Sequence, residues 1–221
     1  MTDVSLEFVP FSAPRGGVSW PGAGVLVVFC DQSLSLPPAA AKLLRGAEDL
    51  IKRAAKVENF KGKSGSALVL PVPHGLPVER LIVVGAGDVG KLEANDLINL
   101  GGAAMGSAPA SVRDVTILAE LPGKSLSADR AADIALGARL RAYYFDRYKT
   151  KKADGESKPT RKKMMIAVSD VAAARKAYVT REAIAEGVVG ARDLVNEPAN
   201  ILYPQEFARR AALLKKHRVG V

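Results

Sequence analysis

Three glycines have a spacing that can hold a phosphate group. Gly85, Gly87 and Gly90 form a G-x-G-x-x-G pattern between an expected strand and an expected helix, where a dinucleotide pyrophosphate can meet a helix N-terminus. Two features count against such a site. The ribose-binding acid should follow about 20 residues on, but Glu120 comes thirty positions after Gly90, and Asp88 would place a negative charge beside the phosphate. A cofactor-free glycine turn is favoured over a dinucleotide-binding domain.

Metal and nucleophilic chemistry find little support in the residue types. His74 and His217 are the only histidines and Cys30 is the only cysteine, and no carboxylates stand at ligand spacing beside them. An intrachain disulfide is excluded, and a metal cluster is not indicated. The serines of residues 62–66 lack the strand and the G-x-S-x-G spacing of a nucleophile elbow. We therefore assign no catalytic residue and no metal ligand, and we expect Cys30 to be a buried filler.

A short basic segment carries much of the positive charge. Seven basic residues stand against Asp154 and Glu156, which leaves 7 − 2 = +5 of the formal net charge of +9. Aromatic residues precede the segment at 143–148, an arrangement that single-strand binders use. A solvated loop is the favoured interpretation, and a nucleic-acid-binding module is the alternative. The candidate anion-binding residues are Lys149, Lys151, Lys152, Lys158, Arg161, Lys162 and Lys163.

Composition indicates an ordinary globular protein. Hydrophobic residues make up 48% of the 221-residue chain and charged residues 25%. No apolar run approaches the roughly 18 residues of a membrane span, and the N-terminus does not resemble a signal peptide. We expect a cytoplasmic protein without a membrane partner.

Strand and helix patterns alternate along the first part of the chain. Apolar runs predict strands at 6–9, 24–30, 67–72, 80–84, 115–119 and 164–168. Helical periodicity predicts helices at 37–54, 92–105 and 127–148. This alternation predicts an α/β domain over residues 1–168, with a mixed, largely parallel sheet flanked by helices.

The last part of the chain is predicted to be helical around a joint. A connecting helix over 169–197 stops at Asn196–Pro198, and Pro204 opens another helix. Residues 218–221 look like the first residues of a strand. We expect residues 198–221 to begin a second, truncated α/β domain. Apolar surface should be exposed along Tyr178–Val195 and Phe207–Leu214 unless other copies or other elements cover it.

The joint carries a family resemblance. Its R-x-L-x-N-x-P-x-N pattern, followed by a proline, resembles the entry to the catalytic domain of the cytosolic leucyl aminopeptidases. The segments 144–152 and 81–87 resemble two further stretches of that family. The signature residues are Arg192, Leu194, Asn196, Pro198, Asn200 and Pro204.

The resemblance implies a hydrolase, a metalloprotease that removes N-terminal amino acids from peptides. It implies an N-terminal domain similar to macro domains, a homo-oligomer (a hexamer in the family), and two divalent metals, manganese or zinc, in the full-length parent; some bacterial members also bind DNA. The family's metal-binding segments match no residue up to Val221. We therefore expect this chain to be a fragment that binds no metal, is inactive alone and serves assembly.

Overall fold

The computed structural model describes residues 4–11, 24–123, 125–148 and 162–220. The chain divides into two compact units, residues 1–185 and 186–221. In the described residues, no helix is long and apolar enough to cross a bilayer.

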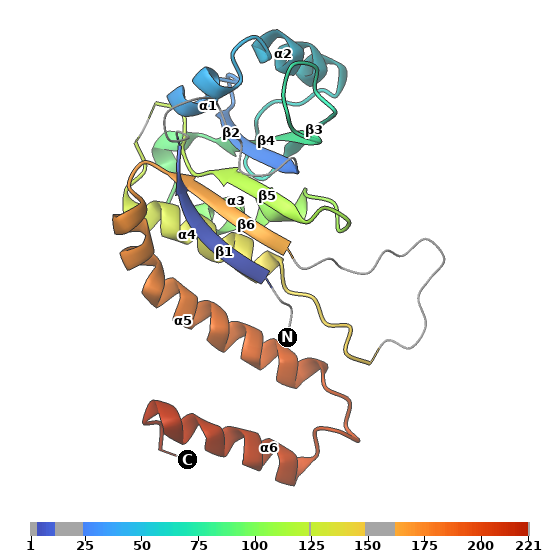
Figure 1. The fold of residues 1–221 in the computed structure, drawn as a ribbon, viewed down its shortest axis with the longest axis vertical. Helices are drawn as coiled ribbons and strands as arrows, with labels where there is room; N and C mark the ends of the chain where they lie inside the picture. Colours follow the sequence, from blue (N-terminus) through green and yellow to red (C-terminus); the bar gives the residue numbers. More distant parts are fainter. Residues whose placement is uncertain (1–3, 12–23, 124, 149–161, 221) are drawn as a thin grey trace. The chain divides into compact units, whose positions relative to one another are not determined.

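The first unit is built on a six-stranded sheet (Figure 1), with the strand order β1-β6-β5-β2-β4-β3. All neighbours are parallel except β3, which runs antiparallel to β4 at one edge. Blue β1 lies beside orange β6 in Figure 1, so the two ends of this unit meet in the sheet. The predicted fold class is confirmed. The strands are β1 (Val4–Pro10), β2 (Val25–Asp31), β3 (Ala67–Pro71), β4 (Arg80–Gly87), β5 (Asp114–Leu118) and β6 (Lys162–Val168).

Helices cover both faces of this sheet. On one face, α1 (Pro38–Leu43) and α2 (Glu48–Val57) pack on side chains of β2, β3 and β4. On the other face lie α3 (Ala94–Gly106), α4 (Ala128–Arg141) and the first turns of α5 (Val171–Asn196). Both faces of β2 are therefore buried, as its unbroken apolar run predicts.

The helix bounds correct two predictions. The helix expected over 37–54 is two helices, because α1 ends at Leu43 and the chain turns through Gly46 at φ +90°. The helix expected to reach Tyr148 ends at Arg141, ahead of aromatic residues and Asp146, which have lower helix propensity. A short 3₁₀ helix, η1 (Val89–Lys91), follows β4.

Close packing of α3 on α4 depends on two glycines. A Cβ on Gly101 would meet the carbonyl of Ile134, and a Cβ on Gly137 would meet the carbonyl of Ile98. Backbones can approach this closely only where side chains are absent. These glycines therefore fix the approach of the two helices.

The start of α5 is fastened to the first unit by aromatic and charged contacts. Tyr178 is 5% exposed, and its ring meets that of Phe8 at 5.4 Å between centroids. Arg181 donates to Asp133 at 3.0 Å and to Asp129 at 2.8 Å, both on α4. The apolar stripe expected from Tyr178 onward is covered at this residue, because its side chain completes the core against β1.

The second unit contains the end of α5, helix α6 (Pro204–Ala212) and a 3₁₀ helix, η2 (Leu213–His217). The strand expected at 218–221 is not present in residues 218–220, since Arg218 takes a left-handed conformation that ends η2. Val195 is 84% exposed and Phe207 is 52% exposed. The expectation of exposed apolar side chains is therefore confirmed at both positions.

Candidate functional site

The signature segment forms a tight joint between two helices. Helix α5 ends at Asn196, and the carbonyl of Pro198 then accepts hydrogen bonds of 2.9 Å from the backbone of Ile201 and of Leu202. Pro204 opens α6, a position that suits its fixed φ and missing N–H. Arg192, Leu194 and Asn196 thus lie on the last turns of α5, Pro198 and Asn200 in the turn, and Pro204 on α6.

A charged network that the sequence reasoning missed joins the two helices. The side chain of Glu197 is fully buried and accepts from Nη1 of Arg210 at 3.2 Å. Nε of Arg210 donates to Glu206 at 2.7 Å, and Arg209 donates to both oxygens of Glu206 at 2.7 and 2.8 Å. Hydrogen bonds from Arg209 and Arg210 lower the pKa of Glu206 to about 2. The spacing of Glu206 to Arg210, one helical turn, was the available signal.

The glycine pattern packs against protein backbone. Gly65 donates to the carbonyl of Gly85 at 2.9 Å, and Gly87 donates to the carbonyl of Gly62 at 3.0 Å. A Cβ on Gly85 would meet the backbone of residues 62–63. A neighbouring loop therefore occupies the space beside Gly85, and the geometry agrees with the glycine-turn interpretation.

The acids near this pattern are also engaged. Asp88 accepts from the backbone of Gly90 at 3.1 Å and pairs with Lys91 at 3.0 Å. Hydrogen bonding to Lys91 and then to Gly90 lowers the pKa of Asp88. Glu120 accepts from the backbone of Ala39 at 2.8 Å, at the start of α1. Burial raises the pKa of the Glu120 carboxyl, although hydrogen bonds from Ala39 and Ala40 act in the opposite direction.

The basic segment is mostly outside the described residues, which leave out 149–161. Lys162 begins β6, and Nζ of Lys163 lies 3.9 Å from Glu7. Ahead of the segment, Phe145 and Tyr148 contact each other at 5.9 Å between ring centroids, and Arg147 lies 5.7 Å from the Phe145 ring. Anion binding by the seven basic residues remains a prediction.

The described residues do not fit the metals that the resemblance implies. Within the described ranges, no three His, Cys, Asp or Glu side chains gather closely enough to hold a metal ion. Cys30 is fully buried, as expected, and burial followed by the charge of Asp31 raises the pKa of its thiol to about 12. Cys30 is therefore suited to packing rather than to nucleophilic chemistry.

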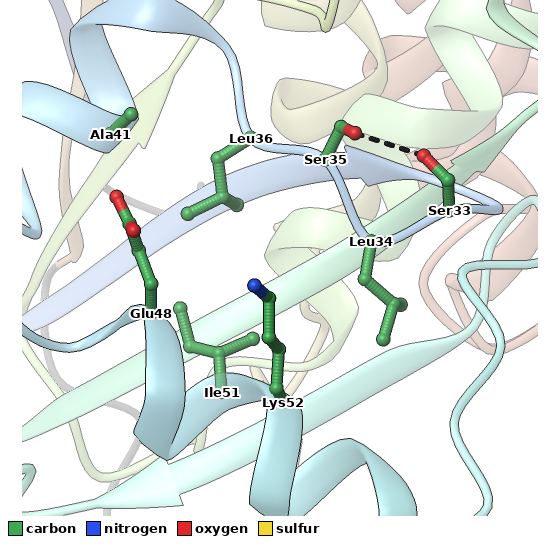
Figure 2. Close-up of a pocket in the computed structure, with 8 residues that line it drawn as sticks. All are labelled: Ser33, Leu34, Ser35, Leu36, Ala41, Glu48, Ile51 and Lys52. Atoms are coloured by element: carbon green, nitrogen blue, oxygen red, sulfur yellow. Dashed lines mark hydrogen bonds between the residues drawn. The ribbon is translucent and has the colours of Figure 1, made fainter.

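Two adjoining cavities, both open to solvent, lie where β2 ends. The sequence reasoning did not find them. One, of about 330 Å³, is lined by residues of the loop 33–36 and of α2 (Figure 2). The second, of about 480 Å³, is lined by Gln32, Phe60, Lys61 and Lys63. Ser33 and Leu34 line both cavities. In the sequence, the one signal that could have indicated these cavities is the pattern Asp31-x-Ser33-x-Ser35 at the end of an apolar strand.

Relatives resemble this chain over nearly its whole length. A probable cytosol aminopeptidase of Afipia carboxidovorans is 52% identical over 223 residues, which cover 100% of this chain and 43% of the relative. A protein of the same description from Rhodopseudomonas palustris strain TIE-1 is 50% identical over 218 residues, which cover 99% of this chain and 42% of the relative. The chain thus spans less than half the length of these curated relatives.

Solved structures share the fold. A mutant of tomato leucine aminopeptidase matches with a TM-score of 0.74 at 24% identity, over 97% of this chain and 42% of that chain. The bottromycin maturation enzyme BotP in complex with Mn matches with a TM-score of 0.65 at 23% identity. The match covers 89% of this chain and 37% of that chain.

A family model decides the assignment. The model described as the cytosol aminopeptidase family, N-terminal domain, matches residues 27–152. This range takes in the sheet from β2 to β5, together with α1 to α4. The chain therefore belongs to the cytosol aminopeptidase family and carries its N-terminal domain.

Proposed function

We propose that this chain is the N-terminal part of a leucyl aminopeptidase, a metal-dependent exopeptidase that releases N-terminal amino acids from peptides. One observation carries the proposal: the whole chain aligns at 52% identity with 43% of a probable cytosol aminopeptidase. Residues 1–168 are its N-terminal domain, residues 169–197 its connecting helix, and residues 198–221 the beginning of its peptidase domain. The protein acts in the cytosol, as the names of its relatives suggest.

The chain on its own is inactive in this proposal. The joint at Asn196–Pro204 supplies ion pairs and turn geometry, and the described residues gather no metal-ligand cluster. Ligands for two divalent metals, manganese or zinc, come from residues outside the 221. The contribution of this chain is assembly into a homo-oligomer, a hexamer as in its family, which sedimentation would measure.

An assay with leucine anilide and Mn²⁺ tests the proposal. The 221-residue chain is compared with a protein extended to the length of the relatives, and both are first shown to be folded by circular dichroism. Turnover by the longer protein alone is expected. Turnover by the short chain would contradict its inactivity, and no turnover by a folded, metal-loaded long protein would contradict the aminopeptidase assignment.

The other two functions have weaker support. Nucleic-acid binding rests on the charge of residues 149–163, and it predicts an affinity that falls steeply with salt. Dinucleotide binding is not favoured, because backbone of residues 62–65 packs against Gly85 and Gly87.

A further inference from the structure

The two cavities lie beside the carboxyl end of β2. Ligands of open α/β sheets bind outside the carboxyl ends of strands. Asp31 is the last residue of β2, and the loop after it lines both cavities.

One wall of the cavities is held in place by an aspartate. Oδ1 of Asp31 accepts from the backbone of Ser33 at 2.8 Å, from the Ser33 hydroxyl at 2.7 Å and from the backbone of Ser35 at 3.0 Å. The loop also carries Leu34 at φ +61°, a conformation that is uncommon for a leucine. Three hydrogen bonds to one carboxylate oxygen fix this turn.

The opposite wall is held by the glycine pattern. Hydrogen bonds from Gly87 to Gly62 and from Gly65 to Gly85 tie the loop 61–65 to the end of β4. Gly62 has φ +58°, and a Cβ there would meet the carbonyl of Asp31, so the two walls abut. The glycines thus hold Lys61 and Lys63 on a fixed loop beside the cavity of about 480 Å³.

The lining carries an excess of positive charge. Lys61 and Lys63 line one cavity and Lys52 lines the other, whereas Glu48 is the one acid that lines either. No ion pair within the described part of the chain engages these three lysines. Figure 2 shows the side chain of Lys52 extending from α2 toward Leu36, and that of Glu48 extending toward Ala41. Two lysines that line the same cavity and make no ion pair with another described residue suit a doubly charged anion.

The hydroxyl groups of Ser33 and Ser35, which line the first cavity, can accept hydrogen bonds from a ligand. The Ser33 hydroxyl donates its hydrogen to Asp31, so the hydrogen of the 2.9 Å contact between Ser33 and Ser35 must come from Ser35. Figure 2 shows the two hydroxyls turned toward each other. Both hydrogens are thereby used, and lone pairs remain to accept from a ligand hydroxyl. Apolar surface for the rest of a ligand comes from Leu34, Leu36 and Ile51.

From this arrangement, we propose that the cavities bind a small phosphorylated sugar, its phosphate at Lys61 and Lys63 and a hydroxyl donating to Ser35. Their volumes, about 330 and 480 Å³, lie within the usual range for small-molecule sites. Binding here does not depend on peptidase activity.

Calorimetric titration of the 221-residue chain with ribose 5-phosphate, inorganic phosphate and ribose tests the proposal. Saturable binding of ribose 5-phosphate, at least about tenfold tighter than inorganic phosphate, is expected. The double substitution Lys61→Ala with Lys63→Ala should weaken it at least about tenfold. Lys56→Ala, at an exposed lysine of α2 outside both linings, should leave it unchanged.

A second variant separates sugar from phosphate recognition. Ser35→Ala should weaken ribose 5-phosphate severalfold and leave inorganic phosphate unchanged. Melting temperatures matching the parent chain show that each variant is folded. The proposal is overturned if ribose 5-phosphate does not bind saturably, if phosphate alone binds equally tightly, or if the double variant retains the parent affinity.

Discussion

The buried carboxylate of Glu197 is held by the guanidinium of Arg210, which donates to it at 3.2 Å from thirteen positions further along the chain. The same guanidinium donates to Glu206 at 2.7 Å on its own helix. Arg210 therefore bridges the end of α5 to the first turn of α6, across the joint that carries the family signature.

The substitution Arg210→Ala should loosen the joint. It leaves the Glu197 carboxylate without this partner, whereas Arg209→Ala removes only contacts to Glu206 at an exposed position. Hydrogen exchange of the α6 amides should become severalfold faster in Arg210→Ala and change little in Arg209→Ala. Equal exchange rates in the two variants would show that the bridge does not order the joint.

Acid should weaken the same network. Hydrogen bonds from Arg209 and Arg210 lower the pKa of Glu206 from 4.5 to about 2. Because the folded pKa is the lower one, the stabilisation is fully present above about pH 4.5 and is lost as the pH falls toward 2. An NMR titration of the Glu206 carboxyl measures this directly, and a midpoint near 4.5 would contradict the ion pairs.

Adding a single methyl group where α3 crosses α4 should destabilise the fold. Gly101→Ala places a Cβ against the Ile134 carbonyl, and we expect a loss of about 1–3 kcal/mol in the free energy of unfolding. Gly102→Ala is the control, since its Cβ would lie 3.9 Å from the nearest carbonyl. The control should be neutral or more stable by up to about 1 kcal/mol. Urea denaturation measures the unfolding free energy of both variants. Equal values for Gly101→Ala and Gly102→Ala would contradict the close approach of α3 to α4 at Gly101.

The contact between Glu120 and α1 gives a prediction on capping and pH. Glu120→Ala removes the acceptor of the Ala39 amide and should cost about 1 kcal/mol, while Glu120→Gln retains a carbonyl acceptor. Burial raises the folded pKa, so ionisation of this carboxyl is less favourable in the folded chain than in the unfolded chain. Its unfavourable contribution should appear as the pH rises through the folded pKa, and it should be absent in Glu120→Gln. Denaturant unfolding at several pH values measures this. The parent chain and Glu120→Gln would show the same dependence of unfolding free energy on pH if the carboxyl does not titrate in this way.

Cys30 should be inert to thiol reagents in the folded protein. Its pKa of about 12 and complete burial leave almost no accessible thiolate near pH 8. Labelling with a disulfide reagent should proceed only after denaturant is added. Rapid labelling of the native chain would contradict the burial of β2.

Local sequence signals predicted the sheet well. The uninterrupted apolar run of β2 indicates a strand buried on both faces, and the alternation of strands and helices indicates the parallel sheet. The break of the first helix at Gly46 was missed because the apolar periodicity continues through it. Tertiary geometry, rather than periodicity, ended that helix.

The polar contacts of the candidate sites could be predicted only in part. Glu206 and Arg210 are one turn apart, so helical spacing alone would have paired them. The bond from Ala39 to Glu120 joins residues 81 positions apart, and the second cavity is lined by the loops 32–34 and 60–63. Such pairs depend on strand order, which the residues at either end do not reveal.

Calorimetric titration of the folded 221-residue chain with Mn²⁺ and with Zn²⁺ tests the central claim most directly. The claim is that this chain supplies the N-terminal domain and the joint, and that the metal ligands come from elsewhere. The expected result is no saturable binding of either ion at micromolar concentration. Binding of two equivalents of metal per chain would contradict the claim.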